Sequence, residues 1–271
     1  MALKLKLHTK PEVPLEADCI CPDRMQSLST TEIKELVVFH GNHQVPLKDF
    51  FECDGNFDGE INIEGDLTDV KHIASAMSFG KITVSGNVGV HTGAAMSGGE
   101  IIIEGDASDW VGPEMFGGSI TIKGNAGHMV GSGYRGSTIG MQGGEIIVHG
   151  NVKNETGHVM RRGLIVVGGN AGDFTGVNMV AGTIIVLGKM GVRPGAGMKR
   201  GSIICQTKSE LLPTFTKSCD YQPSFLRHYF KYLQSLGFTI NDALMNSPFE
   251  RWCGDSIELN RGEILLYAGK Q

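Results

Sequence analysis

The chain has 271 residues with 24 lysines and arginines against 29 aspartates and glutamates, and its formal charge of -5 argues against a nucleic-acid binder. Glycine contributes 39 residues and proline only 9, which excludes collagen and proline-rich linkers and indicates many tight corners. No apolar run approaches the roughly 20 residues that span a bilayer, and Met1–Leu7 lacks the core of a signal peptide, so we expect a cytoplasmic protein without membrane contact.

Residues 1–58 are predicted to form an N-terminal cap. Ser29 is followed three residues later by Glu32, a capping-box pattern that predicts the start of a short helix. Leu36–Phe39 and Gln44–Leu47 flank a His-Gly-Asn-His turn and read as two strands of a hairpin. Such a cap would cover an open end of the element that follows, and it could equally dock a partner.

An internal repeat with a 19-residue period dominates residues 59–207. Each copy resembles Gly99–Gly105, in which apolar residues two apart lie between glycines, a pattern that predicts a short strand with one buried face. One such unit cannot bury its face alone, whereas stacked copies can. We therefore predict an all-β solenoid. It would be a right-handed parallel β-helix of about seven turns, capped by N-terminal and C-terminal α/β extensions.

Two columns of the repeat carry distinctive side chains. A methionine recurs in one register, and we predict that it packs in the interior rather than binding a soft metal. An Asn or Asp follows the second glycine of the strand motif, and we predict that it forms hydrogen bonds at a corner. The methionines are Met77, Met96, Met115, Met141, Met160, Met179 and Met198, and the polar residues are Asp66, Asn87, Asp106, Asn125, Asn151 and Asn170.

One copy of the repeat is longer than its neighbours. Its extra residues lie within 132–138 and predict a surface loop, whose large polar side chains are Tyr134 and Arg135. Such loops often carry function, and an insertion without a role fits the sequence as well.

Residues 208–271 are predicted to form a C-terminal extension. Ser224 precedes apolar residues at helical spacing from Phe225 to Leu236, and Gly237 would end this amphipathic helix. Trp252 and the apolar run 264–267 would supply further burial. The extension could cover the second open end or dock a partner.

The charge is unevenly distributed along the repeat. Three basic and thirteen acidic residues lie between positions 49 and 131, whereas nine basic and three acidic residues lie between positions 132 and 208. Arg161 and Arg162 follow one methionine, and Lys199 and Arg200 follow another in the same register two turns later, about 10 Å away. This basic stripe would attract an extended anion, although a solvated face without a ligand fits equally.

The usual catalytic constellations are absent from the sequence. We find no histidine pair with metal spacing, no nucleophile elbow and no phosphate loop, and we expect neither a catalytic residue nor a metal site. We interpret the six scattered cysteines as free thiols of a reducing compartment. They are Cys19, Cys21, Cys53, Cys205, Cys219 and Cys253.

The turn 144–152 and the following Thr156–Met160 resemble the GXGXG repeat. That repeat occurs in the C-terminal domain of the glutamate synthase large subunit and in the C subunit of formylmethanofuran dehydrogenase. The flanks 28–51 and 225–264 resemble the C subunit of the bacterial formyltransferase/hydrolase complex, so the resemblance spans nearly the whole chain.

This resemblance implies a non-catalytic structural subunit of a complex in tetrahydromethanopterin-dependent one-carbon metabolism. The implied partners are an amidohydrolase-like subunit, a formyltransferase subunit and a protein like a molybdopterin subunit. The complex would use tetrahydromethanopterin and a methanofuran-type carrier, and this chain alone would bind no cofactor. The glutamate-rich tail of that carrier suggests a use for the basic residues. The candidate carrier-binding residues are Arg135, Arg161, Arg162, Lys199 and Arg200.

Two other functions are weighed against this one. A stand-alone glutamate synthase-type GXGXG domain serving an amidotransferase would share the repeat, but it is normally joined to large catalytic domains that this chain lacks. A polysaccharide-acting β-helix would present carboxylates or aromatic rings in a groove, whereas this chain has only two tryptophans, Trp110 and Trp252.

Overall fold

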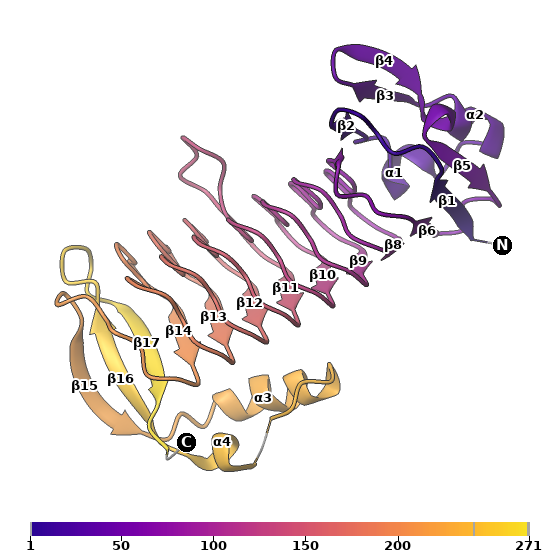
Figure 1. The fold of residues 1–271 in the computed structure, drawn as a ribbon. Helices are drawn as coiled ribbons and strands as arrows, with labels where there is room; N and C mark the ends of the chain where they lie inside the picture. Colours follow the sequence, from indigo (N-terminus) through magenta and orange to yellow (C-terminus); the bar gives the residue numbers. More distant parts are fainter. Residues whose placement is uncertain (1, 241, 270–271) are drawn as a thin grey trace.

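A computed structural model of the chain describes residues 2–240 and 242–269. The chain forms an elongated stack of coils with a smaller piece at each end (Figure 1). A sheet of 13 strands runs through the whole stack, and its order is β15-β16-β17-β14-β13-β12-β11-β10-β9-β8-β6-β1-β5. A second sheet of four strands, in the order β4-β3-β2-β7, belongs to the N-terminal end.

The strands of the repeat pair with one another in parallel, each with the equivalent strand of the next copy. Ile101 pairs with Ile82 on one side and with Ile120 on the other, so apolar residues stack on apolar residues. A row of parallel bridges at a second edge, such as Val88 with Ala107, also joins successive copies. This large parallel sheet in a mostly β chain is consistent with a β-helix. The strands are β6 (Glu60–Glu64), β8 (Lys81–Ser85), β9 (Glu100–Ile103), β10 (Ser119–Ile122), β11 (Glu145–Val148), β12 (Leu164–Val167), β13 (Thr183–Val186) and β14 (Ser202–Cys205).

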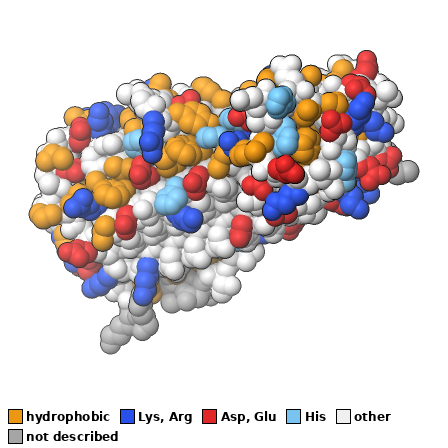
Figure 2. All heavy atoms as spheres, turned by 45° about the horizontal axis from the view of Figure 1, so that its top comes forward, with side chains coloured by type: hydrophobic (Ala, Val, Ile, Leu, Met, Phe, Trp, Pro, Cys, Tyr) orange, Lys and Arg blue, Asp and Glu red, His pale blue; other side chains and the backbone are white. Residues whose placement is uncertain are grey.

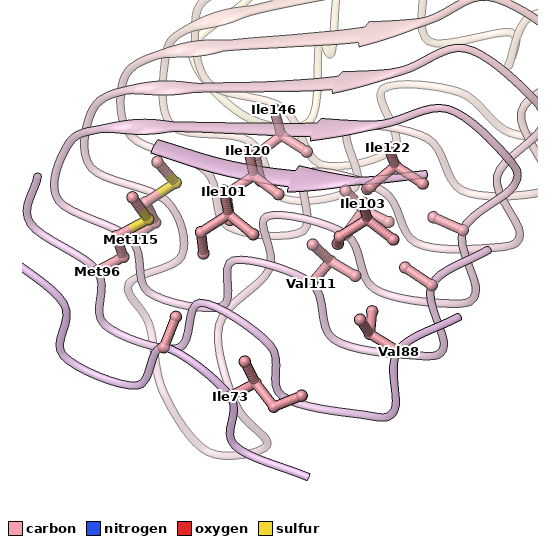
Figure 3. Close-up of a cluster of buried hydrophobic side chains, with 14 of the residues drawn as sticks. Ile73, Val88, Met96, Ile101, Ile103, Val111, Met115, Ile120, Ile122 and Ile146 are labelled. Atoms are coloured by element: carbon pink, nitrogen blue, oxygen red, sulfur yellow. The ribbon is translucent and has the colours of Figure 1, made fainter. Parts of the chain in front are cut away.

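The methionines of the repeat lie in the interior, as predicted, and all seven are fully buried. Each methyl group fills the space beside a glycine of the next coil. A Cβ atom added at Gly118 would lie 2.7 Å from Met96 Cε, and one added at Gly144 would lie 2.7 Å from Met115 Cε. The methionine column therefore requires the glycine that opens the following strand. Figure 3 shows Met96 and Met115 among the isoleucines of this interior.

The Asn and Asp side chains form a ladder at another corner. Asn87 Oδ1 accepts the backbone N–H of Asp106 at 2.9 Å, and Asp106 Oδ1 accepts the N–H of Asn125 at 2.6 Å. The same bond continues through Asn151 to Asn170. Corner hydrogen bonding is thus confirmed, but its partner is the backbone of the next coil, so each side chain joins two coils.

The N-terminal piece continues the long sheet. Strand β1 (Leu3–Leu7) pairs in parallel with β6 and antiparallel with β5 (Phe51–Asp54). The predicted capping box is present, because Ser29 Oγ accepts the N–H of Glu32 and the Glu32 carboxylate accepts the N–H of Ser29. The predicted hairpin is also present as β3 and β4. The other elements are β2 (Leu15–Glu16), α1 (Pro22–Met25), α2 (Thr30–Lys34), β3 (Val37–His40), β4 (His43–Pro46), η1 (Leu47–Asp49) and β7 (Val70–Lys71).

The C-terminal piece extends the sheet and covers part of its outer face. Strand β17 pairs in parallel with β14, and β16 and β15 follow it antiparallel. The predicted amphipathic helix is α3 (Leu226–Ser235), which buries Leu226, Phe230 and Leu233. The remaining elements are β15 (Thr216–Tyr221), α4 (Asp242–Asn246), β16 (Phe249–Gly254) and β17 (Gly262–Tyr267). None of the helices in the described ranges is long and apolar enough to cross a bilayer.

A second hydrophobic core lies where α3 packs against the outside of the last four coils. In the earlier strands the outward position is partly exposed, as at Thr83 and Thr121. In β11 to β14 it is apolar and buried beneath Leu226, Phe230 and Leu233. The outward residues of that face are Ile147, Val166, Ile185 and Ile204.

Candidate anion-binding groove

The basic stripe lies at the corner between each methionine and the next strand. Here the chain runs in stacked register, because the N–H of Arg161 bonds to Met141 O and that of Lys199 to Met179 O, both at 2.8 Å. Two residues follow each methionine at this corner. The last three coils place Arg161 and Arg162, then Val180 and Ala181, then Lys199 and Arg200 in these two positions.

A groove of about 590 Å³ opens along this corner. Its centre is formed by the coil that carries Val180 and Ala181, whose short apolar side chains leave a hollow between the two basic pairs. With about 4.8 Å between coils, the two pairs stand about 10 Å apart. The lining residues are Gln142, Arg161, Arg162, Val180, Ala181, Lys199, Arg200 and Leu259.

The four cations of the groove are exposed. Among the described residues, their one ion pair joins Lys199 Nζ to Glu258 Oε2 at 3.9 Å. Within the described part of the chain, the three guanidinium groups therefore have no carboxylate partner, and they line one hollow. Guanidinium groups in this arrangement bind carboxylates or phosphates through charge-assisted hydrogen bonds.

The structure brings together four of the five candidate residues. Arg135 is exposed in the connection between β10 and β11, part of which projects from the stack in Figure 1, and the lining of the groove does not include it. The contribution of Leu259 was not predicted, because this residue lies 60 positions beyond Lys199 in the sequence. Val180 and Ala181 could have been found, because they occupy the register of the basic pairs.

Aromatic rings and imidazoles form a row on a different corner of the acidic half. The rings of His72 and His91 stack with centroids 4.8 Å apart, and the Trp110 ring lies 5.5 Å from that of His91. The inserted loop joins this row, because Tyr134 Oη lies 3.2 Å from His91 Nδ1. All three repeat residues have positive φ, between 53° and 65°. Figure 2 shows histidine and hydrophobic side chains interspersed along one face of the molecule.

We expect this row to make the stability of the fold dependent on pH, through His91. Burial lowers the pKa of His91, with smaller contributions from His72 and Lys71 that are opposed by Glu16 and Asp109. As the pH falls below about 6.5, the His91 side chain is therefore protonated more readily in the unfolded chain than in the folded one, which favours unfolding. We expect the melting temperature to fall on acidification, and His91→Gln should flatten that fall.

The measurement is thermal unfolding of both proteins between pH 7.5 and 5. His43→Gln, at an exposed position of β4, is the matched control and should retain the wild-type pH dependence. An equally steep pH profile for the His91 variant would contradict the assignment. Burial also lowers the pKa of His149, so part of the slope should persist.

The described residues contain no group of three His, Cys, Asp or Glu side chains placed to hold a metal ion. The six cysteines are free thiols, as predicted. Burial raises the pKa of Cys19 to about 12 and that of Cys21 to about 11. Both thiols are therefore protonated and unreactive near neutral pH.

Comparison with known proteins relates the chain to C subunits of formylmethanofuran dehydrogenases and to a formyltransferase/hydrolase complex. The GXGXG motif family matches residues 68–222. The C subunit of molybdenum-containing formylmethanofuran dehydrogenase 1 from Methanothermobacter marburgensis is 47% identical over 84 residues, covering 30% of this chain and 21% of that protein. The C subunit of tungsten-containing formylmethanofuran dehydrogenase 2 from Methanothermobacter wolfeii is 44% identical over 89 residues, covering 31% and 33%. The matched segments thus span only about a fifth to a third of these relatives.

A solved structure matches over nearly the full length. It is the crystal structure of the formyltransferase/hydrolase complex (FhcABCD) from Methylorubrum extorquens in complex with methylofuran. One of its chains superposes with a TM-score of 0.92 at 32% identity, covering 98% of this chain and 100% of that chain. The chain therefore belongs to the GXGXG family as a homologue of the formylmethanofuran dehydrogenase C subunit, with a full-length counterpart in the formyltransferase/hydrolase complex.

Proposed function

We propose that this chain is the structural subunit of a formyltransferase/hydrolase complex in tetrahydromethanopterin-dependent one-carbon metabolism, located in the cytoplasm. The observation that carries the proposal is the full-length similarity to a chain of such a complex, end pieces included. A GXGXG match alone would also suit an amidotransferase domain. The similarity of both flanks favours the formyl-transfer assembly.

In this proposal the coils, a right-handed helix of about seven 19-residue turns, hold an amidohydrolase-like subunit, a formyltransferase subunit and a molybdopterin-subunit-like protein. Residues 1–58 and 208–271 act as end pieces around the repeat at 59–207. The catalytic groups belong to the partners, and this chain contributes surfaces and charge.

We further propose that the groove guides a methanofuran-type carrier. The relative's complex was solved with methylofuran, and a carrier with several carboxylates would find two basic pairs about 10 Å apart. Arg161, Arg162, Lys199 and Arg200 would bind its anionic tail. Arg135 stays a predicted contact from outside the groove. Electrostatic attraction of this kind raises the rate of encounter and weakens with salt.

The test replaces all four groove cations by glutamine in the assembled complex. Exposed charge pairs contribute about 0.2–1 kcal/mol each, so we expect carrier affinity at low salt to fall about tenfold to a hundredfold. Formyl transfer through the complex should slow in parallel, and the difference from wild type should shrink as salt is added.

The matched control replaces four exposed cations of the N-terminal piece by glutamine, namely Lys4, Lys6, Lys10 and Arg24. Because this variant loses the same charge far from the groove, its carrier affinity should stay near wild type. Unchanged affinity and turnover in the groove variant would refute the guiding role. Purification of the native chain without formyltransferase and amidohydrolase-like subunits would refute the structural role.

A further inference from the structure

One wall of the groove comes from a segment that is distant in sequence. Residues 255–261, which we call the strap, connect β16 to β17 and lie against the last coil. Asp255 anchors the strap. Its side chain is fully buried, its Oδ2 accepts the N–H of Gly197 at 3.0 Å, and its Oδ1 accepts the N–H of Ile257 at 3.2 Å. The backbone N–H groups of Glu258 and Asn260 both donate to Asp255 O at 3.1 Å.

This anchoring fixes what the strap presents to the groove. Leu259 is 50% exposed and forms an apolar wall beside the cations. Glu258 brings its carboxylate to 3.9 Å from Lys199 Nζ. Among the described residues, Glu258 is the one carboxylate paired with a groove cation. Its backbone is held in place by the hydrogen bond from its N–H to Asp255 O.

A carboxylate in this position acts against any anion that enters. A ligand carboxylate that reaches Lys199 must displace Glu258 or lie beside a like charge. A ligand with one carboxylate gains little from that exchange. A ligand with several carboxylates also contacts Arg161 and Arg162, about 10 Å away, and keeps a net gain.

We propose that Glu258 is a built-in counter-ion of the groove and that the strap selects for oligocarboxylate ligands over single carboxylates. This inference rests on the proposed carrier-guiding function. It adds a specificity determinant: Glu258 weakens binding of every anion, and only ligands with carboxylates spread along the groove overcome it. Leu259 supplies an apolar contact for the uncharged part of such a ligand.

The test uses the full-length chain and a fluorescein-labelled tetraglutamate as the probe, with fluorescence anisotropy at low salt. We expect Glu258→Gln to bind this probe about threefold to tenfold more tightly than wild type, because one repulsive charge is removed. Acetate, a single carboxylate added as a competitor at constant ionic strength, should displace the probe more effectively from the variant than from wild type. Glu35→Gln, which removes another exposed carboxylate from an ion pair with a lysine, is the matched control and should bind as wild type does.

A double-mutant cycle shows whether Glu258 acts through Lys199. In a Lys199→Gln background, the gain from Glu258→Gln should largely disappear. Wild-type affinity for tetraglutamate in Glu258→Gln would overturn the counter-ion role and leave the groove intact. No measurable binding by either protein would overturn the groove's carrier function together with the counter-ion. Equal thermal stability of the variants shows that any change arises in the groove.

Discussion

Replacing Gly144 with alanine should destabilise the chain by about 2–5 kcal/mol. Gly144 has φ of +80°, a left-handed conformation that costs other residues about 1–2 kcal/mol. Its added Cβ would also lie 2.5 Å from Gly118 O and 2.7 Å from Met115 Cε, so the coil must shift to relieve the overlap. Chemical denaturation of the wild type and the variant gives the difference directly.

Gly136→Ala separates the two causes. Gly136 has φ of +87°, but an added Cβ there would have no atom within 4 Å. This control should therefore lose only the stability that the positive φ costs an alanine, about 1–2 kcal/mol. If Gly136→Ala and Gly144→Ala lose the same stability, the close contacts of Gly144 with Gly118 O and Met115 Cε contribute nothing. Met115→Ala should cost about 2–5 kcal/mol by leaving a cavity, and it should relieve the Gly144 variant only in part, because the contact with Gly118 O remains.

Replacing Phe230 with alanine should loosen helix α3 from the outer face of the stack. Phe230 is fully buried in the second core, and such truncations cost about 3–5 kcal/mol. The loss falls on the packing of α3 against the outer face of β11 to β14 and against Phe249 of β16. We therefore expect local opening there while the coils themselves stay folded.

Limited proteolysis and binding of a hydrophobic dye measure this opening. Cleavage should concentrate between residues 208 and 245, and dye binding should rise as Val166 and Ile185 become exposed. Lys231→Ala, at an exposed position of the same helix, should behave as wild type. Resistance of the Phe230 variant to cleavage, together with a uniform loss of stability, would show that α3 and the coils unfold as one unit.

Much of the architecture could be predicted because the same pattern of strand and corner residues recurs in each copy of the repeat. Isoleucines two residues apart predict the strands, and a methionine that returns in one register predicts interior packing. The cover on the outer face was not predicted. Its signal was present in Ile147, Val166, Ile185 and Ile204, where earlier coils carry partly exposed residues. The sequence did not indicate that helix α3, with Phe230 and its neighbours, is the segment that covers this apolar face.

The groove was predictable in part for the same reason. Arg161 and Lys199 share a column, so their proximity follows from the repeat. The wall contributed by Leu259 and the charge of Glu258 come from a segment outside the repeat. The periodicity of the repeat therefore does not predict where this segment lies. Their placement depends on the buried Asp255 and its bond to Gly197, a contact between residues 58 positions apart.

The ladder from Asn87 to Lys189 determines how a chain of this kind can change its length. Every rung joins one coil to the next through the same two atoms, so removal of one whole repeat would reconnect equivalent atoms and leave a shorter stack with its columns aligned. Removal of a single residue from a strand would instead place its side chains on the wrong face and break the ladder at that level. The seven residues added near Tyr134 are accommodated because they leave the stack and rejoin it in register. Insertions and deletions are therefore tolerated either as complete coils or as loops outside the columns. The length of the stack then changes only in steps of one coil spacing.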